Sequence, residues 1–416
     1  MEARLPSEAD AVVVGTCAFG LSVTAQLARL GYRRVVALDR FAVGSQTSPR
    51  AAGLFKSVQA DELRTRLARM AIETVCTFER DTGVTVPFVA SGSLMIARTA
   101  RHAAVIDEEV EAARRWGVEV DTISPAEAVR LAPYLSAGAI VRAASVPGDI
   151  YIEEPVSLLE AYREAAERFG ASVFGQVPVT KVIVSRGAVT GVETPLGTIR
   201  TETVVDAAGA WVRAVARTAG ADLPIVPLRH QLAISHPLAG VAPEQPIVRI
   251  FDAAVYVRPC RGGLMWGGFE VEPLPLDPAA MGEGFSIDRV PLDFRVLEGF
   301  AAAVRDTVAV LHGAAVQEHR GGLFTMTPDG RFVVGPVPGV RGLWVLSGCN
   351  GSGFSFSPAL GRVLAEWIVT GRPSIDVGPL TLARFVRAFA EEELRAAAIH
   401  QYTHYYEPVE ETSERG

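Results

Sequence analysis

The first forty residues contain two short apolar runs separated by an amphipathic segment. Ala11 to Val14 is a run of Ala and Val suited to a buried parallel strand, and Val35 to Leu38 is a second such run. Between them, Thr16 to Leu30 has the apolar spacing of a helix. The pattern predicts a βαβ unit near the start of the chain.

The hydrophobic pattern further along predicts a mixed α/β protein. Periods near 3.6, with polar or glycine boundaries, predict helices over Asp61–Thr82, Ala103–Trp116, Ser124–Leu131 and Pro155–Phe169. Period-2 alternation predicts a strand over Ser91–Ala100 and several from Ala171 to Val212, with turns at Arg186–Gly187 and Leu196–Gly197. The region from Pro224 to Val316 is strand-rich, and a glycine-rich loop and helix follow Gly348.

Composition and charge narrow the class of protein. The 416 residues are 49% hydrophobic and 21% charged, with a net charge of -7 and no basic block, which argues against nucleic acid or anionic lipid as a partner. There is no run of signal-peptide or membrane-span length, so we expect a soluble, cytoplasmic protein. The four cysteines, Cys17, Cys76, Cys260 and Cys349, are far apart, which predicts free thiols and no metal site.

The turn after the first predicted strand carries a degenerate glycine motif. Gly15 and Gly20 occupy the first and last positions of G-x-G-x-x-G, while Cys17 replaces the middle glycine. Asp39 ends the second strand, where such units accept a hydrogen bond from a ribose 2′-hydroxyl. The motif predicts a dinucleotide site, with FAD or NAD preferred over NADP because of the acid; an ordinary βα turn is the alternative.

Several later motifs resemble one family. The segment Val204 to Trp211, VVDAAGAW, resembles the turn that returns the chain over FAD in two-domain flavoproteins, and Phe324 to Gly371 resembles the closing segment of the D-amino-acid oxidase superfamily. Within that superfamily the chain is most similar to the flavin domain of the dimethylglycine and sarcosine dehydrogenase group. The motifs that carry this likeness are PRAAGL at 49–54, LRHQ at 228–231, YVRP at 256–259 and QYTHYY at 401–406.

The resemblance implies a Rossmann-like FAD-binding domain assembled from segments 1–84, 146–218 and 323–375. It implies a substrate domain with a mainly antiparallel sheet, made of 85–145 and 219–322, and a helical tail over 376–416. The residues that it implies for FAD binding are Gly15, Cys17, Ala18, Phe19, Gly20, Asp39, Arg40, Thr47, Ser48, Arg50, Ala51, Ala52, Val182, Ala208, Gly209, Trp211, Asp329, Gly348, Asn350, Gly351, Ser352, Gly353 and Phe354.

The chain also departs from the family pattern. Arg50 stands where the dehydrogenase group carries its flavin-linking histidine, and Gly321 to Leu323 replaces the neighbourhood of the linking cysteine of sarcosine oxidases. We therefore expect FAD without a covalent link. Met265 replaces an oxygen-activating lysine, which predicts slow reaction with oxygen, and Gly53 and Ser355 replace the two residues that grip a carboxylate.

Four residues are candidates for the chemistry. An amine must lose its proton before hydride can leave its α-carbon, and His230 and Tyr256 match the catalytic histidine and tyrosine of dimethylglycine-oxidising relatives. Without the resemblance, both would be assigned to sheet packing. Lys56 and Arg258 are candidate charges near the flavin, and an exposed lysine is the alternative for Lys56. If Lys56 binds no acid, we expect a neutral pocket lined by Phe55, Met265, Trp266 and Phe269.

The expected activity is oxidation of the C–N bond of a small secondary or tertiary amine, with an N-methyl group, to an imine that water hydrolyses. The partners would be that amine and either oxygen or an electron carrier, with the oligomeric state open. Two alternatives stay open: oxidation of a 2-hydroxy acid or another polar small molecule, and a noncatalytic flavin-carrying subunit that passes electrons.

Overall fold

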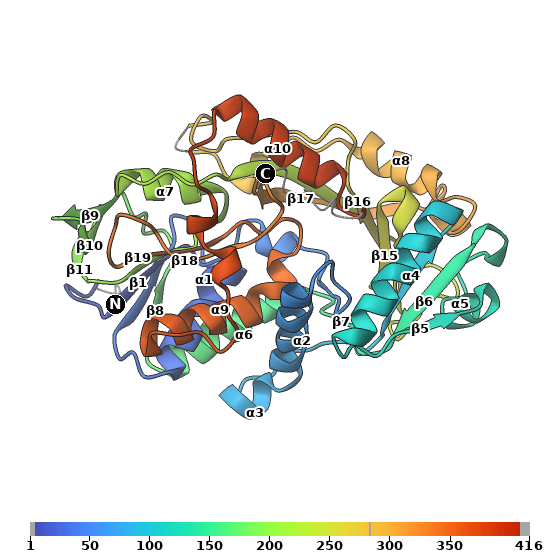
Figure 1. The fold of residues 1–416 in the computed structure, drawn as a ribbon, viewed down its shortest axis with the longest axis horizontal. Helices are drawn as coiled ribbons and strands as arrows, with labels where there is room; N and C mark the ends of the chain where they lie inside the picture. Colours follow the sequence, from blue (N-terminus) through green and yellow to red (C-terminus); the bar gives the residue numbers. More distant parts are fainter. Residues whose placement is uncertain (1–4, 283, 408–416) are drawn as a thin grey trace, which may run out of the picture.

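The structure, a computed structural model, describes residues 5–282 and 284–407. Within these residues the strands form a six-stranded sheet, an eight-stranded sheet and two small sheets. Figure 1 shows the mostly parallel six-stranded sheet in the left half of the molecule and strands of the eight-stranded sheet on the right. This mixed α/β architecture confirms the predicted fold class, whereas the exact domain boundaries stay a prediction.

The six-stranded sheet is built around the predicted βαβ unit. Its strands, in spatial order, are β18 (Val333–Pro336), β19 (Leu343–Ser347), β12 (Val204–Asp206), β1 (Ala11–Val14), β2 (Val35–Leu38) and β8 (Ser172–Phe174). All neighbours pair in parallel except β18 and β19. The bounds of β1 and β2 are those expected from the sequence, because both strands are fully buried and therefore lack polar residues.

Helices cover one face of this sheet and a second, small sheet covers the other. On one face α1 (Ala18–Arg29) packs against α6 (Val156–Arg168) and α9 (Gly353–Thr370), and α2 (Glu62–Cys76) packs on α9. The opposite face packs beneath α7 (Val212–Thr218) and a sheet of β9 (Lys181–Ser185), β10 (Ala188–Thr194) and β11 (Gly197–Arg200).

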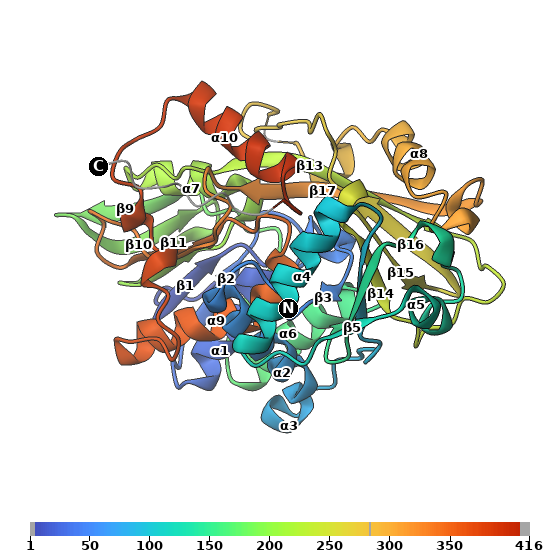
Figure 2. The ribbon, with the colours of Figure 1, turned by 45° about the vertical axis from the view of Figure 1, so that its right-hand side comes forward.

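The eight-stranded sheet confirms the expected mainly antiparallel second layer. Its order is β17 (Val316–Met326), β13 (Val226–Ser235), β16 (Gly263–Gly268), β15 (Val255–Cys260), β14 (Ile247–Ile250), β4 (Ser93–Ala97), β6 (Arg142–Val146) and β5 (Asp121–Ile123). Only the β14–β4 pair is parallel among these described strands. Figure 2 shows α4 (Ala100–Arg115) and α10 (Glu391–Thr403) along one face, and α5 (Pro125–Leu131) and α8 (Phe294–Ala303) pack on the other.

The remaining elements are short. Strands β3 (Leu54–Phe55) and β7 (Ile150–Tyr151) form a two-stranded antiparallel sheet between the two halves. The 3-10 turns are η1 (Ser48–Arg50), η2 (Ala137–Ala139), η3 (Gly209–Trp211), η4 (Phe251–Ala253), η5 (Ile287–Arg289), η6 (Ala309–Leu311), η7 (Gly378–Leu380) and η8 (Leu382–Arg384).

Three predicted helices differ from the structure at their bounds. The helix expected over 61–82 is interrupted at Thr77, whose backbone leaves the helical region (φ -105°, ψ 5°), so α3 (Phe78–Thr82) is separate. Helix α4 begins at Ala100, three residues before the predicted start, because the Thr99 hydroxyl caps it by accepting a hydrogen bond from the His102 amide. The first helix begins at Ala18 rather than Thr16, because the glycine turn extends through Cys17. The predicted tail contains α10, and its residues 408–416 lie outside the described residues.

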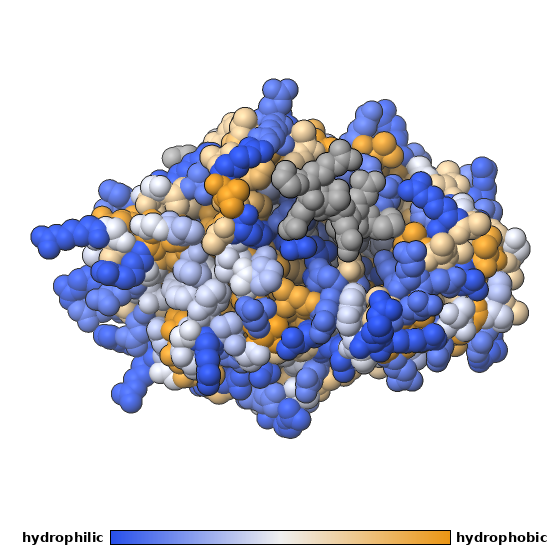
Figure 3. Space-filling model, viewed as in Figure 1, coloured by the Kyte–Doolittle hydropathy of each residue, from blue (hydrophilic) through white to orange (hydrophobic). Residues whose placement is uncertain are grey.

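The surface of the molecule is mostly polar. Figure 3 shows hydrophilic residues over most of the visible face, with hydrophobic residues in small separate groups. Over residues 5–282 and 284–407, no helix combines the length and apolar character needed to cross a membrane.

Candidate active site

The turn after β1 requires glycine at both motif positions. Gly15 has a φ of +101°, and a Cβ there would lie 2.5 Å from the carbonyl oxygen of Ala207. A Cβ on Gly20 would lie 1.9 Å from the carbonyl oxygen of Gly15, so α1 approaches the turn closely only without a side chain. Both positions therefore have the geometry that the dinucleotide motif demands.

Cys17, at the middle motif position, lines two cavities beside the turn and bonds to the residue that follows β12. Its Sγ donates to the carbonyl oxygen of Ala207 at 3.2 Å, and burial raises the pKa of the thiol to about 11. The thiol therefore stays protonated at neutral pH and behaves as a small packed group.

Asp39 joins the end of β2 to this turn. One carboxylate oxygen accepts from the amide and hydroxyl of Thr16 at 2.7 and 2.6 Å, and the other accepts from the Phe41 amide at 2.8 Å. Burial raises the pKa of Asp39. An ionised carboxylate offers about four acceptor positions, so one remains for a ligand hydroxyl.

Two adjoining cavities follow the carboxyl ends of the parallel strands. We call the first the turn cavity; its wall includes Gly15, Asp39, Thr180, Ala208 and Trp211. The second, the tyrosine cavity, is lined by His230, Tyr256, Phe269, Tyr405 and Tyr406 among others. They share Cys17, Thr47, Ser48, Gly209 and Ala210, so the pair forms one elongated site at the sheet edge where α/β folds bind ligands.

Most of the predicted cofactor residues line this pair of cavities. The turn cavity includes Gly15, Cys17, Asp39, Arg40, Thr47, Ser48, Ala208, Gly209 and Trp211. The tyrosine cavity includes Ala18, Phe19, Arg50, Ala51, Ala52, Gly351, Ser352, Gly353 and Phe354, together with Lys56, His230 and Tyr256.

Other predicted residues shape the site without lining it. Gly20 sits beneath the turn, and Val182 is buried in the core while Val179 and Thr180 form the cavity wall. The Asp329 carboxylate is bound by Arg384 at 2.6 Å. Asn350 bonds through its side-chain oxygen to the Thr327 amide at 2.9 Å and through its side-chain nitrogen to the carbonyl of Gly348 at 2.7 Å, which fixes the loop before α9.

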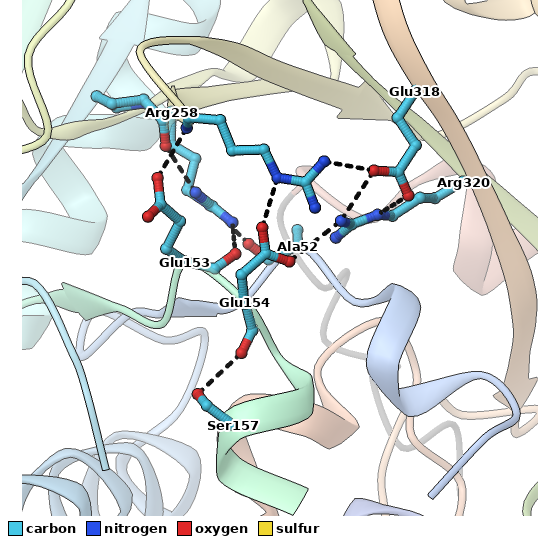
Figure 4. Close-up of polar contacts among 9 residues, drawn as sticks. Ala52, Glu153, Glu154, Ser157, Arg258, Glu318 and Arg320 are labelled. Carbon is cyan, nitrogen blue, oxygen red and sulfur yellow. Dashed lines mark hydrogen bonds and ion pairs between the residues drawn. The ribbon is translucent and has the colours of Figure 1, made fainter.

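The structure surrounds the Arg258 guanidinium with backbone carbonyls, and the predicted catalytic role of Arg258 stays a prediction. All three guanidinium nitrogens donate to backbone carbonyls, those of Ala52 at 2.7 Å, Pro259 at 2.6 Å and Glu153 at 3.0 Å. Figure 4 shows these contacts. The buried charge therefore holds the 52–53 loop against the eight-stranded sheet, and each of its three nitrogens has a carbonyl partner.

An ion network lies beside Arg258 (Figure 4) and joins the two halves of the molecule. Glu154, just before α6, is bound by Arg261 at 2.6 Å and by Arg320 at 3.2 Å, and Glu318 is bound by the same two arginines at 2.7 and 2.5 Å. Arg320 lines the tyrosine cavity, but these two carboxylates balance its charge.

His230, on β13, is held between two tyrosines from other elements. Its Nδ1 lies 2.8 Å from the Tyr402 hydroxyl and its Nε2 lies 3.0 Å from the Tyr256 hydroxyl. The ring stacks on Phe324 with 4.2 Å between centroids, and only 6% of the residue is exposed. Burial lowers the pKa of His230 to about 3, so the imidazole is neutral and accepts at one nitrogen while donating at the other.

Tyr256 fits because the facing residue is glycine. A Cβ on Gly267, its cross-strand partner, would lie 2.3 Å from the Tyr256 hydroxyl. Burial raises the pKa of Tyr256, so the phenol stays protonated. The predicted pair of His230 and Tyr256 is thus brought together at the cavity wall.

The C-terminal tail supplies two wall residues, Tyr405 and Tyr406, and a third tyrosine, Tyr402, that contacts His230 from behind the wall. Tyr402 bonds to His230, Tyr405 stacks on Phe269 with 4.0 Å between centroids, and Tyr406 lines the same cavity. The Tyr405 hydroxyl also bonds to the Ser352 hydroxyl at 2.7 Å. The QYTHYY motif was the available signal, but its distance in sequence from the sheet hid this contact.

Lys56 lies at the end of the tyrosine cavity. Its Nζ is 5.5 Å from the ring centroid of Tyr405 and 5.8 Å from that of Tyr406. Burial lowers the pKa of Lys56. Burial alone would raise the pKa of Tyr405, but the Lys56 charge and the Ser352 hydroxyl oppose it, and the net shift is downward.

Arg50 turns its charge away from the cavity interior. It donates to the carbonyl of Ser45 at 2.6 Å and to that of Gln46, and it pairs with the exposed Asp288. Arg50 nevertheless remains among the residues that line the tyrosine cavity.

The structure also shows the surroundings of the other residues that differ from the family pattern. A Cβ on Gly53 would lie 2.1 Å from the carbonyl oxygen of Ile152, so a basic side chain has no room there. Met265 is buried with Leu232, Ile234 and Cys260. Of the four residues expected to line a neutral pocket, Phe269 is in the described wall, whereas Phe55, Met265 and Trp266 are buried in packed layers because their strands turn them away.

Cys349 is a half-buried residue that lines the tyrosine cavity. Its Sγ accepts from the Thr325 amide at 3.2 Å, and burial raises the pKa of the thiol.

Within the described ranges, no group of three or more metal-ligating side chains is close enough to hold an ion.

Comparison with known proteins gives a consistent match. The family model described as FAD dependent oxidoreductase matches residues 10–367. The chain is 29% identical to human sarcosine dehydrogenase over 97% of this chain and 45% of that protein. It is also 29% identical to 4-methylaminobutanoate oxidase (formaldehyde-forming) of Paenarthrobacter nicotinovorans, over 92% of this chain and 46% of that protein. The chain therefore spans less than half the length of these relatives.

The fold also matches solved structures. L-proline dehydrogenase from P. horikoshii superposes with a TM-score of 0.81 and 23% identity, covering 92% of this chain and 98% of that one. At this identity the likeness concerns the fold.

Proposed function

Because the chain belongs to the FAD-dependent oxidoreductase family, we propose that it oxidises the C–N bond of a small N-methyl amine in the tyrosine cavity. The observation that carries this proposal is the neutral His230 held between Tyr256 and Tyr402 at the wall of a largely buried cavity. The names of the two sequence relatives, which act on N-methylated amino acids, support the same substrate class.

FAD is the cofactor, and the residues present fit it. The glycine cradle at Gly15 suits a pyrophosphate at the start of α1, and the free acceptor position of Asp39 suits a ribose hydroxyl. The loop before α9 and the 47–54 loop line the tyrosine cavity, where the isoalloxazine would be held. When bound, FAD supplies the hydride acceptor.

The protein would prepare the amine for hydride loss. A cationic amine is disfavoured in a buried site, so the cavity favours the neutral amine whose lone pair assists the reaction. The Tyr256 hydroxyl, oriented by His230, can hydrogen-bond to the amine nitrogen. With a pKa of about 3, His230 acts by orienting Tyr256 and does not store a proton at neutral pH.

We further propose that FAD is held without a covalent link. Arg50 and Gly322 line the cavity where linked relatives carry histidine and cysteine, and neither side chain forms such a bond. Cys17 and Cys349, which also line the wall, have raised thiol pKa values and are poor nucleophiles.

Formaldehyde measurement tests the proposed reaction class. Purified FAD-loaded protein is incubated with sarcosine, dimethylglycine, 4-methylaminobutanoate and the matching 2-hydroxy acids, and formaldehyde is measured against flavin reduced. We expect one formaldehyde for each reduced flavin with at least one methylamine. Flavin reduction by a 2-hydroxy acid and by no methylamine would favour a hydroxy-acid oxidising enzyme. Flavin reduction by none of these compounds would favour a noncatalytic electron-carrying subunit.

A further inference from the structure

The wall of the tyrosine cavity includes a lysine, Lys56, that forms no ion pair with an acid among the described residues. The Phe269 ring lies 5.3 Å from the His230 ring, Tyr405 stacks on Phe269 at 4.0 Å, and Lys56 Nζ lies 5.5 Å from the Tyr405 ring. These contacts form a chain along the cavity wall from His230 through Phe269 and Tyr405 to the lysine. A ligand that contacts both Lys56 and His230 would lie along these rings within the tyrosine cavity.

A second cation lies behind the same tyrosines. Arg249 on β14 is the cross-strand partner of Tyr256 and is 3% exposed. Its Nε and Nη2 are buried without a hydrogen-bond acceptor in the described part of the chain, and its guanidinium lies 5.5 Å from the Phe251 ring. After burial, which is the largest cause, the Arg249 charge helps to lower the pKa of Lys56.

The acids nearby do not neutralise these two cations. Among residues 5–282 and 284–407, no carboxylate lies within ion-pair distance of Lys56 or Arg249. The Asp149 carboxylate is occupied by the Ser57 amide and hydroxyl and by the Ser93 hydroxyl, at 2.6 to 2.7 Å. Burial raises the pKa of both Asp149 and Glu109, which disfavours their charged forms.

A buried cation without a counter-ion, as Arg249 is in the described part of the chain, is unfavourable unless an anion reaches it, and the half-buried Lys56 is the cation that lines the cavity. We propose that Lys56, with Arg249 behind it, forms an anion subsite that binds the carboxylate of the substrate. This inference rests on the proposed function, because it takes the amine to lie at Tyr256 and His230. In an α-amino acid the carboxylate is only two bonds from the nitrogen, so the subsite selects a methylamino acid whose acid group is separated by a longer carbon chain.

Equilibrium binding of a matched pair of unreactive probes tests the subsite. Butanoate and butanamide have similar shapes, and each is titrated into the FAD-loaded protein while the flavin absorption spectrum is followed. We expect butanoate to bind at least tenfold tighter than butanamide. We expect Lys56→Met to bind butanoate about ten- to a hundredfold more weakly, because a charge-assisted hydrogen bond of the usual strength is lost. We expect Arg249→Met to bind butanoate about tenfold more weakly.

The controls are Lys181→Met and Arg66→Met, which remove exposed charges elsewhere and are expected to change neither affinity. Flavin content and melting temperature show whether each variant is folded. If Arg249→Met is unstable, the butanoate affinity of Lys56→Met alone tests the subsite. Equal binding of the two probes to the parent protein, or unchanged butanoate affinity in Lys56→Met, would overturn the subsite. Because no turnover is needed, a subsite without any amine oxidation would contradict only the proposed function.

Discussion

At the scale of single residues, the environment of each polar group decides its protonation state. His230 is neutral because it is buried, and its two ring nitrogens are both engaged by tyrosine hydroxyls. Lys56 is the reverse case, a cation that keeps an unfavourable position beside the cavity. Both residues could be singled out from the sequence, but only their surroundings give them distinct roles.

The lowered pKa of His230 makes stability depend on pH. The unfolded chain binds a proton at this residue below about pH 6.5, whereas the folded chain binds it only near pH 3, so stability falls as pH is lowered between these values. The slope is about 1.4 kcal/mol per pH unit for one such group. Denaturant unfolding at pH 6.5 and 4.5 should show a smaller loss in His230→Gln than in the parent. Equal losses in the two proteins would show that His230 is not buried in the neutral form.

The glycine turn gives a second test at this scale. Gly20→Ala would force a Cβ into the carbonyl of Gly15, so the turn must move, and we expect a lower FAD content and a loss of about 1–3 kcal/mol in unfolding free energy. Gly299→Ala on α8, which meets nothing within 4 Å, is the matched control and should be neutral or slightly stabilising. Flavin absorbance per protein and chemical unfolding measure both effects. Full FAD content in Gly20→Ala would be inconsistent with the close approach described.

At the scale of elements, helix α10 closes the site from the far end of the chain. Leu394, Ala398 and Tyr402 are buried against the eight-stranded sheet, and Tyr402 reaches His230. The helix therefore positions the tyrosine cavity as well as covering apolar surface.

Weakening the packing of α10 should loosen the cavity. Leu394→Ala removes a buried side chain, and such changes cost about 2–5 kcal/mol, here localised to the docking of the tail. We expect a higher Michaelis constant and faster proteolysis of the tail, while flavin content is kept. The neighbouring exposed residue provides the control, Arg395→Ala. If both variants behave like the parent, the docking of α10 does not position the working site.

The βαβ unit was predictable from sequence because buried parallel strands leave an uninterrupted apolar run. The β1 and β2 bounds agree with the structure, and Gly15 and Gly20 have the expected geometry. The break at Thr77, the wall residues Tyr405 and Tyr406 and the Tyr402–His230 contact were not predictable, because local pattern carries no record of contacts between distant segments. The carbonyl partners of Arg258 were not predictable for the same reason, since two of them come from other loops.

At the scale of the whole molecule, the site lies where two layers meet. The parallel sheet supplies the glycine turn and the loop before α9, while the eight-stranded sheet supplies His230 and Tyr256. The Arg261, Arg320, Glu154 and Glu318 network joins the two halves next to the cavity (Figure 4). An elongated cofactor would contact both halves along its length.

The mode of FAD attachment is a property of the whole assembled site. We expect trichloroacetic acid to release all the yellow colour into the supernatant, because Arg50 and Gly322 cannot form the links made in related enzymes. Flavin absorbance in the supernatant and the washed pellet measures the outcome. Colour retained in the pellet would contradict the proposal and would direct attention to Cys349.

The most direct test of the central claim is flavin absorbance after anaerobic mixing with N-methyl amines. We expect at least one methylamino acid to bleach the flavin, and His230→Ala to slow that bleaching by about a hundredfold, whereas the exposed control His312→Ala leaves it unchanged. Flavin that stays oxidised with every N-methyl amine, while a chemical reductant still bleaches it, would contradict the account.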